Sequence, residues 1–297
     1  MPMSPPEPAD AARLATIPVI PFDLTRKLEA ELASGEVRLP SFPDVAQRVQ
    51  QVLADDRATP ALIARVLGAD AALAARVLRI ANSAVFSPAG RPVADLPNAI
   101  ARLGCELVRC AALSFALRQM QIVDAESELR PQLQELWRKS ALVASVGYVI
   151  ARETRAARPD EGLIVGLLHN IGRLYLVVRA GALNAEYAAS GLWDQVLHDW
   201  HPRIGRAILE HWRFPPRIAL AVADQNAWER ERGGNALADV LIAATSLVPC
   251  VFDRELLDDT VTSVAPFRRL GLATADCNRL LAAAAPQIYG LLDALST

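Results

Sequence analysis

Apolar residues recur at intervals of three and four positions along most of this 297-residue chain. Val45, Val49 and Val52, for example, fall on one face of a helix, the spacing typical of an amphipathic helix. No part of the sequence combines alternating β-branched residues with hairpin turns, as strands would require. We therefore predict an all-α fold, with helices over residues 24–33, 45–53, 60–67, 71–81, 97–117, 131–151, 161–178, 182–189, 193–212, 215–226, 236–248 and 274–295.

Two short helices joined by only a few residues are predicted within residues 60–81. Thr59 and Asp70 are suitable N-caps for them, because their side-chain oxygens can accept hydrogen bonds from the first free N–H groups. Such a pair resembles a helix-turn-helix, whose second helix reads DNA. However, only Arg76 and Arg79 on that helix could contact phosphates or bases, so we do not expect nucleic-acid binding.

The composition narrows the class of protein. Hydrophobic residues make up 52% of the chain and charged residues 22%, which is typical of a folded globular protein. The 31 Lys and Arg residues face 33 Asp and Glu residues, so the chain lacks the basic excess of a dedicated nucleic-acid binder. Charged residues or Pro interrupt each apolar run before the roughly 20 residues that a bilayer requires, and the start lacks a signal-peptide pattern. The four cysteines form no CxxC pair, and we expect reduced thiols in a cytoplasmic protein without membrane contact.

One polar pair interrupts the most apolar stretch of the sequence. His169 and Asn170 stand between Leu168 and Ile171, where neighbouring residues would be buried. A buried polar side chain costs about 1–3 kcal/mol unless it is hydrogen-bonded. Either a structural hydrogen-bond network or a functional site must therefore hold this pair, and from the pattern alone a structural role is favoured.

Residues 167–174, LLHNIGRL, resemble the LLHDIGKL signature of HD-type metal-dependent phosphohydrolases. In that superfamily a first His, the His-Asp pair and a distant Asp hold divalent metal ions. Such metals activate water for the hydrolysis of phosphate esters. The match to this signature is close, but Asn170 takes the place of the Asp.

Segments on both sides of this signature make the resemblance more specific. They resemble the HDOD family, the HD-related output domain, in the same order along the chain. These segments are LPSFP at 39–43, ADAAL at 69–73, RIANSA at 79–84, NAIARLG at 98–104, HPRIG at 201–205 and WRFP at 212–215. The resemblance covers about residues 39–250, which is most of the chain.

The resemblance also indicates where the metal ligands of the HD superfamily would fall. Lys139, before Ser140, stands in place of the first His. His169 is kept, whereas Asn170 replaces the Asp of the pair and Thr245 replaces the late Asp. Only one ligand of four is therefore retained.

These replacements argue against metal binding. An ammonium group at Lys139 would repel a divalent cation, and Asn170 offers a neutral carbonyl where a carboxylate is needed. The His-His pair of many relatives would fall on Asp224 and Gln225. We therefore expect no metal, no cofactor and no catalytic residue, with Lys139 acting as an internal cation in place of the metal. The candidate residues of the degenerate pocket are Lys139, His169, Asn170, His201 and Thr245.

The resemblance implies a non-catalytic bacterial signal-transduction output or adaptor module that acts by protein–protein contact. Its partner in trans would be a response regulator, a sensor kinase or a cyclic-di-GMP turnover protein. The resemblance leaves open whether the chain forms a homodimer. The alternative is a metal-dependent phosphohydrolase or a nucleotide-binding remnant of the HD superfamily. The resemblance implies three parts: a flexible Pro-rich tail at 1–25, an HDOD domain at 26–250 and a C-terminal extension at 251–297. The HDOD domain would consist of an N-terminal helical lobe at 26–130 and a degenerate HD-like lobe at 131–250. The C-terminal extension would add one or two packing helices.

Overall fold

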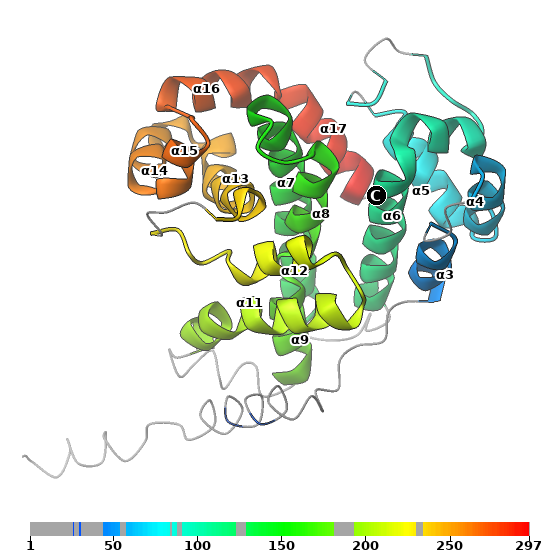
Figure 1. The fold of residues 1–297 in the computed structure, drawn as a ribbon, viewed down its shortest axis with the longest axis horizontal. Coiled ribbons are helices and arrows are strands. Elements are labelled where there is room, and N and C mark those ends of the chain that lie inside the picture. The colour runs from blue at the N-terminus through cyan, green and yellow to red at the C-terminus, as the bar shows by residue number, and fades with distance from the viewer. Residues whose placement is uncertain are drawn as a thin grey trace, which may run out of the picture.

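The computed structural model describes residues 26, 30, 44–53, 58–83, 85–87, 91–122, 129–180, 193–229 and 234–296. Within these ranges the secondary structure is helical and contains no strand, which confirms the predicted all-α fold (Figure 1). The predicted tail at 1–25, the LPSFP motif and the helix at 182–189 lie outside the described residues. So does the predicted helix at 24–33, apart from residues 26 and 30.

The N-terminal helices pack together, and we call them the first lobe. They are α3 (Asp44–Leu53), α4 (Pro60–Leu67), α5 (Ala71–Ala81) and α6 (Leu96–Ile122). The N-caps are those expected: the Thr59 hydroxyl accepts from the N–H of Leu62 at 3.3 Å, and Asp70 Oδ1 accepts from the N–H of Ala72 at 2.9 Å. Helix α6 bends at Gly104, whose φ of 75° favours glycine.

The second lobe is built around three helices, α7 (Arg130–Thr154), α8 (Pro159–Leu168) and α9 (Ile171–Ala180). Glycines let α7 and α8 approach closely, because a Cβ on Gly147 would lie 2.8 Å from the Gly162 carbonyl oxygen. The prediction of a single helix over 161–178 was wrong, because the chain turns at His169 and Asn170. Apolar residues continue on both sides of this turn, and the polar pair within it was interpreted as a site inside one helix and not as a break.

The remaining helices complete this lobe and add the C-terminal extension. They are α11 (Trp193–His211), α12 (Pro216–Ala223), α13 (Ala236–Phe252), α14 (Leu257–Ser263), α15 (Ala265–Arg269), α16 (Thr274–Ala283) and α17 (Ala285–Ser296), with a short 3-10 helix at Arg254–Leu256. The extension therefore holds four α-helices, not one or two, and the single helix expected over 274–295 is divided. Gly271, with a φ of 68°, lies in the turn before α16.

Helix α17 joins the two lobes. It packs on α7 of the second lobe and on α5 of the first (Figure 1). Arg76 of α5 is only 2% exposed, and its guanidinium donates a hydrogen bond to the carbonyl oxygen of Leu295. Arg76 therefore cannot serve as a DNA contact, and the exposed Arg79 remains the only basic side chain of α5 that could.

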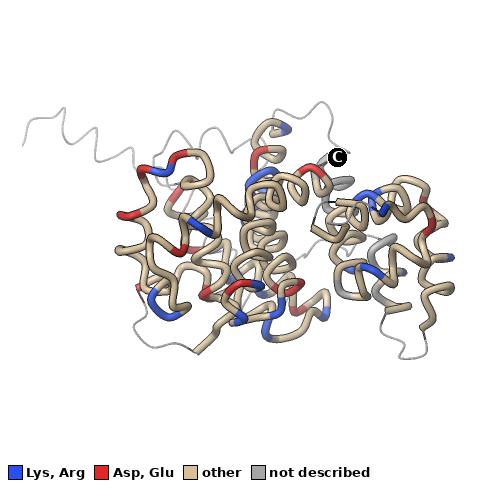
Figure 2. Tube along the Cα trace, turned by 90° about the horizontal axis from the view of Figure 1, so that it is seen from above, with Lys and Arg blue, Asp and Glu red and all other residues tan. Residues whose placement is uncertain are grey.

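Charge and hydropathy add two observations. Lys and Arg alternate with Asp and Glu along the described trace, without collecting on one side of it (Figure 2). One segment, Pro159–Ala180, is long and apolar enough to span a bilayer, with a mean hydropathy of 1.4, but 72% of it is buried inside the protein. Because α8 and α9 lie within this segment, its apolar character is explained by its central position in the lobe.

Candidate functional site

A cavity of about 540 Å³ lies in the second lobe, and we call it the central cavity. All five candidate residues from the sequence line it, from four different helices or turns. Its lining consists of Lys139, Val143, His169, Asn170, Arg173, His198, His201, Gln225, Asn226, Trp228, Ile242, Thr245, Ser246, Val248, Pro249 and Val264. The structure therefore brings together positions that are more than 100 residues apart in the sequence.

His169 is held at the turn between α8 and α9. Its Nδ1 lies 2.7 Å from the carbonyl oxygen of Gly166, and because a carbonyl only accepts, Nδ1 carries the proton. Burial above all lowers the pKa of His169 to about 4; the hydrogen bond to Gly166 opposes this shift, and the charge of Arg173 adds to it. The ring is therefore neutral at pH 7 and its Nε2 carries a lone pair.

His201 on α11 is the second buried histidine of the cavity. Burial above all, together with His169, Arg173 and His198, lowers its pKa to about 3. The nearby carbonyl of His169 acts in the opposite direction but does not offset the burial. Its Nδ1 is buried and has no hydrogen-bond partner among the described residues. Its place in the cavity depends on Gly172, where a Cβ would overlap the carbonyl oxygen of His201.

Asn170 and Lys139 occupy two of the former metal-ligand positions. The Asn170 amide donates a hydrogen bond to the Ser140 hydroxyl at 3.3 Å, and both side chains are buried. Lys139 is different: its side chain is 54% exposed and its Nζ lies 3.8 Å from Oε1 of Glu135. Lys139 is therefore a half-exposed cation of the cavity lining that is paired with Glu135, and not the internal cation expected from the sequence.

Arg173 is the cation that lies within the cavity, and sequence reasoning did not select it. It is partly buried on α9, one turn after His169. Burial lowers the pKa of Arg173, and the nearby carboxylate of Asp194 opposes this only in part. Its Nε is buried without a hydrogen-bond partner among the described residues. The available signal was its position, since Arg173 takes the place of the Lys in the LLHDIGKL signature.

The remaining two family positions are occupied by groups that are already hydrogen-bonded. The Thr245 hydroxyl donates to the carbonyl of Leu241 in its own helix at 2.9 Å. The Gln225 amide donates to the His169 carbonyl at 3.1 Å and to the Val222 carbonyl at 2.8 Å. Asp224, the neighbour of Gln225, does not line the cavity.

The donor set of the central cavity does not fit a divalent metal. Metals of the Mg, Mn and Fe type require carboxylate oxygens or several converging imidazoles; no Asp or Glu lines the cavity, and its three histidines, His169, His198 and His201, are not grouped so as to hold a metal ion. Across the described ranges no group of three or more His, Cys, Asp and Glu side chains could hold a metal ion. The guanidinium of Arg173 would in addition repel a cation placed beside His169.

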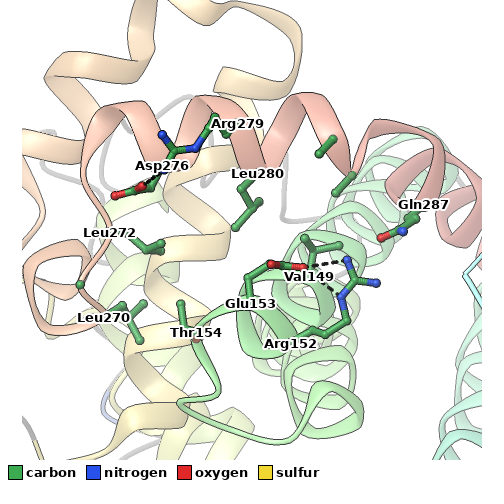
Figure 3. A pocket seen from close by; sticks show the side chains of 13 residues that line it. Val149, Arg152, Glu153, Thr154, Leu270, Leu272, Asp276, Arg279, Leu280 and Gln287 are labelled. Carbon is green, nitrogen blue, oxygen red and sulfur yellow. Dashed lines mark hydrogen bonds and ion pairs between the residues drawn. The ribbon is translucent and has the colours of Figure 1, made fainter.

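A second cavity, of about 600 Å³, lies between the end of α7 and the helices α16 and α17 (Figure 3). Its charged side chains are paired with one another. Arg152 lies 3.0 Å from Glu153, and Arg279 forms an ion pair with Asp276. This cavity is therefore electrically balanced, in contrast to the central cavity.

The fold and the central cavity together define a helical protein of the HD type, and the comparisons with known proteins identify the family. The HDOD domain family matches residues 39–228, which is more than half of the chain. This chain belongs to the HDOD family, as its motifs predicted.

Solved structures share this fold. One is named "Putative metal-dependent phosphohydrolase", from Shewanella amazonensis SB2B, with 24% identity and a TM-score of 0.77 over 93% of this chain and 99% of that chain. Another is an HDOD domain protein with unknown function from Geobacter sulfurreducens, with 23% identity and a TM-score of 0.64 over 91% of this chain and 96% of that one. A third is named "Putative signal transduction protein", from Marinobacter aquaeolei VT8, with 22% identity and a TM-score of 0.57 over 91% of this chain and 61% of that one. No curated protein matches the chain.

Proposed function

We propose that this chain is a non-catalytic signal-transduction output or adaptor module. The observation that carries the proposal is the donor set of the central cavity. The positions that would hold a metal in HD phosphohydrolases converge there, but they present a neutral His169, a neutral Asn170 and the cationic Arg173. One structural neighbour is named a signal transduction protein, which is in keeping with this role.

The chemistry of phosphate ester hydrolysis explains why this donor set supports a non-catalytic role. In an HD site the metal lowers the pKa of a bound water and polarises the phosphoryl oxygen. Three imidazoles line the central cavity, but no Asp or Glu in its lining could orient them or serve as a general base. A module of this kind would act by contact, in trans, on a response regulator, a sensor kinase or a cyclic-di-GMP turnover protein. The four cysteines are free thiols, which supports a cytoplasmic location.

Metal content and hydrolysis test the non-catalytic proposal. The protein is purified without chelator, and its Mg, Mn, Fe and Zn are measured by elemental analysis. We expect far less than one metal ion per chain and no hydrolysis of bis(p-nitrophenyl) phosphate with added Mn²⁺. A stoichiometric metal, or hydrolysis that disappears in His169→Ala, would overturn the proposal.

The adaptor role requires its own experiment. The protein is immobilised and challenged with native lysate, and retained proteins are identified by mass spectrometry against beads carrying an unrelated helical protein. We expect enrichment of a two-component or cyclic-di-GMP signalling protein. Retention of no signalling protein above the control would contradict an output role.

A further inference from the structure

The central cavity carries positive charge without a matching negative charge. Two of its lining residues, Lys139 and Arg173, are cationic, and none of the others is Asp or Glu. Asp194 and Glu135 act on these cations from outside the lining. In the second cavity, by contrast, each arginine has a carboxylate partner within the lining (Figure 3). Within the described part of the chain, the central cavity therefore differs from the second cavity in its excess of positive charge.

Arg173 is held with unused hydrogen-bonding capacity. Its Nε is buried and has no partner among the described residues. Such a group loses its hydration without compensation, so each instance in a native structure requires an explanation. An oxyanion in the cavity would supply the missing acceptor and the missing charge together. A guanidinium presents several donors in one plane, which matches oxyanions well.

We propose that the central cavity is a metal-independent binding site for a small organic phosphate, with Arg173 as its anchor. The cavity volume of about 540 Å³ is within the range of pockets that enclose ligands of this size. This inference rests on the proposed non-catalytic function, since a hydrolase would consume such a ligand instead of retaining it.

The other lining residues indicate which part of the ligand they would meet. The amides of Asn170 and Asn226 each use one N–H for a bond within the protein, to Ser140 and to the His198 carbonyl, and each keeps a second. A phosphate has three terminal oxygens, so it can use these amides and both cations, whereas a carboxylate has two. An apolar wall of Val143, Ile242, Val248, Pro249 and Val264 remains for the organic part.

Calorimetric titration of the full chain tests this inference. The probes are AMP, ribose 5-phosphate, inorganic phosphate and malate, each without added metal. We expect the two organic phosphates to bind at least about tenfold more tightly than malate. Tighter binding of AMP would identify the organic part as a nucleoside, and equal binding would identify it as the sugar phosphate alone.

Three variants connect the binding to the cavity. Arg173→Gln is expected to weaken binding of the organic phosphates by about tenfold or more, because it removes a charge-assisted hydrogen bond. Arg179→Gln, on the same helix but outside the cavity, is the matched control and should bind like the wild type. Lys139→Glu changes an exposed side chain at low risk to folding and should also weaken binding by several-fold.

The outcomes separate this inference from the proposed function. No binding of any phosphate up to about 5 mM, stronger binding of malate, or unchanged binding in both Arg173→Gln and Lys139→Glu would overturn the phosphate site. None of these results touches the adaptor role. Conversely, metal-dependent hydrolysis would overturn the non-catalytic function while leaving the measured binding intact.

Discussion

The two buried histidines make the stability of the protein sensitive to mild acid. In the unfolded chain a histidine has a pKa near 6.5, whereas burial holds His169 at about 4 and His201 at about 3. Above pH 6.5 both rings are neutral in both states, so they contribute no pH dependence. As the pH falls below 6.5 the unfolded chain binds protons first, and the folded state loses stability until the pH reaches the folded pKa values.

The difference between the folded and unfolded pKa values predicts how steeply the free energy of unfolding falls with pH. Between pH 6.5 and 4.5, each buried histidine should reduce the free energy of unfolding by about 1.4 kcal/mol per pH unit. His169→Gln and His201→Gln should each flatten the decline, whereas His211→Gln, an exposed histidine outside the cavity, should leave it unchanged. Urea denaturation at a series of pH values measures this. Equal slopes for all three variants would show that His169 and His201 do not cause the pH dependence of stability.

Gly172 is a second residue whose role can be tested. A Cβ at this position would overlap the His201 carbonyl oxygen and would lie 2.7 Å from the backbone nitrogen of Gly205. Both obstacles are backbone atoms, so they cannot yield as a side chain would. We expect Gly172→Ala to lower the free energy of unfolding by about 3 kcal/mol.

Chemical denaturation measures this loss against a matched glycine. A Cβ on Gly234 would meet nothing within 4 Å, so Gly234→Ala should change stability by less than about 0.5 kcal/mol. Similar stabilities for the two variants would show that α9 and α11 can separate at little cost.

At the residue scale, the sequence predicted which positions line the central cavity. It did not predict which side chain carries the positive charge inside it. Lys139, His169, Asn170, His201 and Thr245 all line it. Their side chains could not be assigned roles in advance, because the orientation of Lys139 toward solvent depends on the packing around it. Arg173 was missed although it takes the place of the Lys in the LLHDIGKL signature, because helical periodicity alone does not show that its side chain lies within a cavity.

At the element scale, helices that begin at a clear N-cap were predictable and those without one were not. The caps Thr59 and Asp70 fixed the starts of α4 and α5, and the structure agrees to the residue. The break between α8 and α9 escaped prediction because α8 is buried along almost its whole length and apolar residues resume directly after the turn. The helices α14 and α15 have only 7 and 5 residues, too few for a periodic pattern to be recognised.

One ion pair fixes α15 against α13. Asp239 is 4% exposed and accepts two hydrogen bonds from Arg269, at 2.9 and 2.6 Å. The interaction also raises the pKa of Arg269. Removing one partner leaves a buried charge, so Arg269→Ala should cost about 3–5 kcal/mol.

The neighbouring arginine provides the control for this pair. Arg268 is exposed on the same short helix, and Arg268→Ala should change stability by less than about 0.5 kcal/mol. Thermal unfolding followed by circular dichroism compares the two variants. If Arg269→Ala unfolds at the same temperature as Arg268→Ala, the pair does not hold α15 in place.

At the scale of the whole molecule, α17 is expected to stabilise both lobes at once. Its Ile288, Leu291 and Leu295 are at most 1% exposed, and each such side chain contributes about 1.5–3 kcal/mol when buried. Deleting residues 285–296 should therefore lower the free energy of unfolding by several kcal/mol and lower the unfolding temperature of both lobes. Tyr289→Ala, at a position 48% exposed, should have little effect.

Hydrogen exchange distinguishes a shared role from a local one. In the chain without α17, we expect faster exchange in α5 and in α7, the two helices on which it packs. Faster exchange in α7 alone would show that the first lobe does not depend on α17. The sequence indicated helices in this region, but a long-range contact such as Arg76 with Leu295 has no signature in local periodicity.

The hydrogen bond from Arg76 to Leu295 also bears on how the protein can be handled in the laboratory. Because the last turns of α17 lie between the lobes, a bulky fluorescent label attached to this helix where it meets α5 would press on both lobes. Labelling there is expected to weaken the attachment of the lobes. A label for imaging or capture therefore belongs on an exposed side chain outside α17.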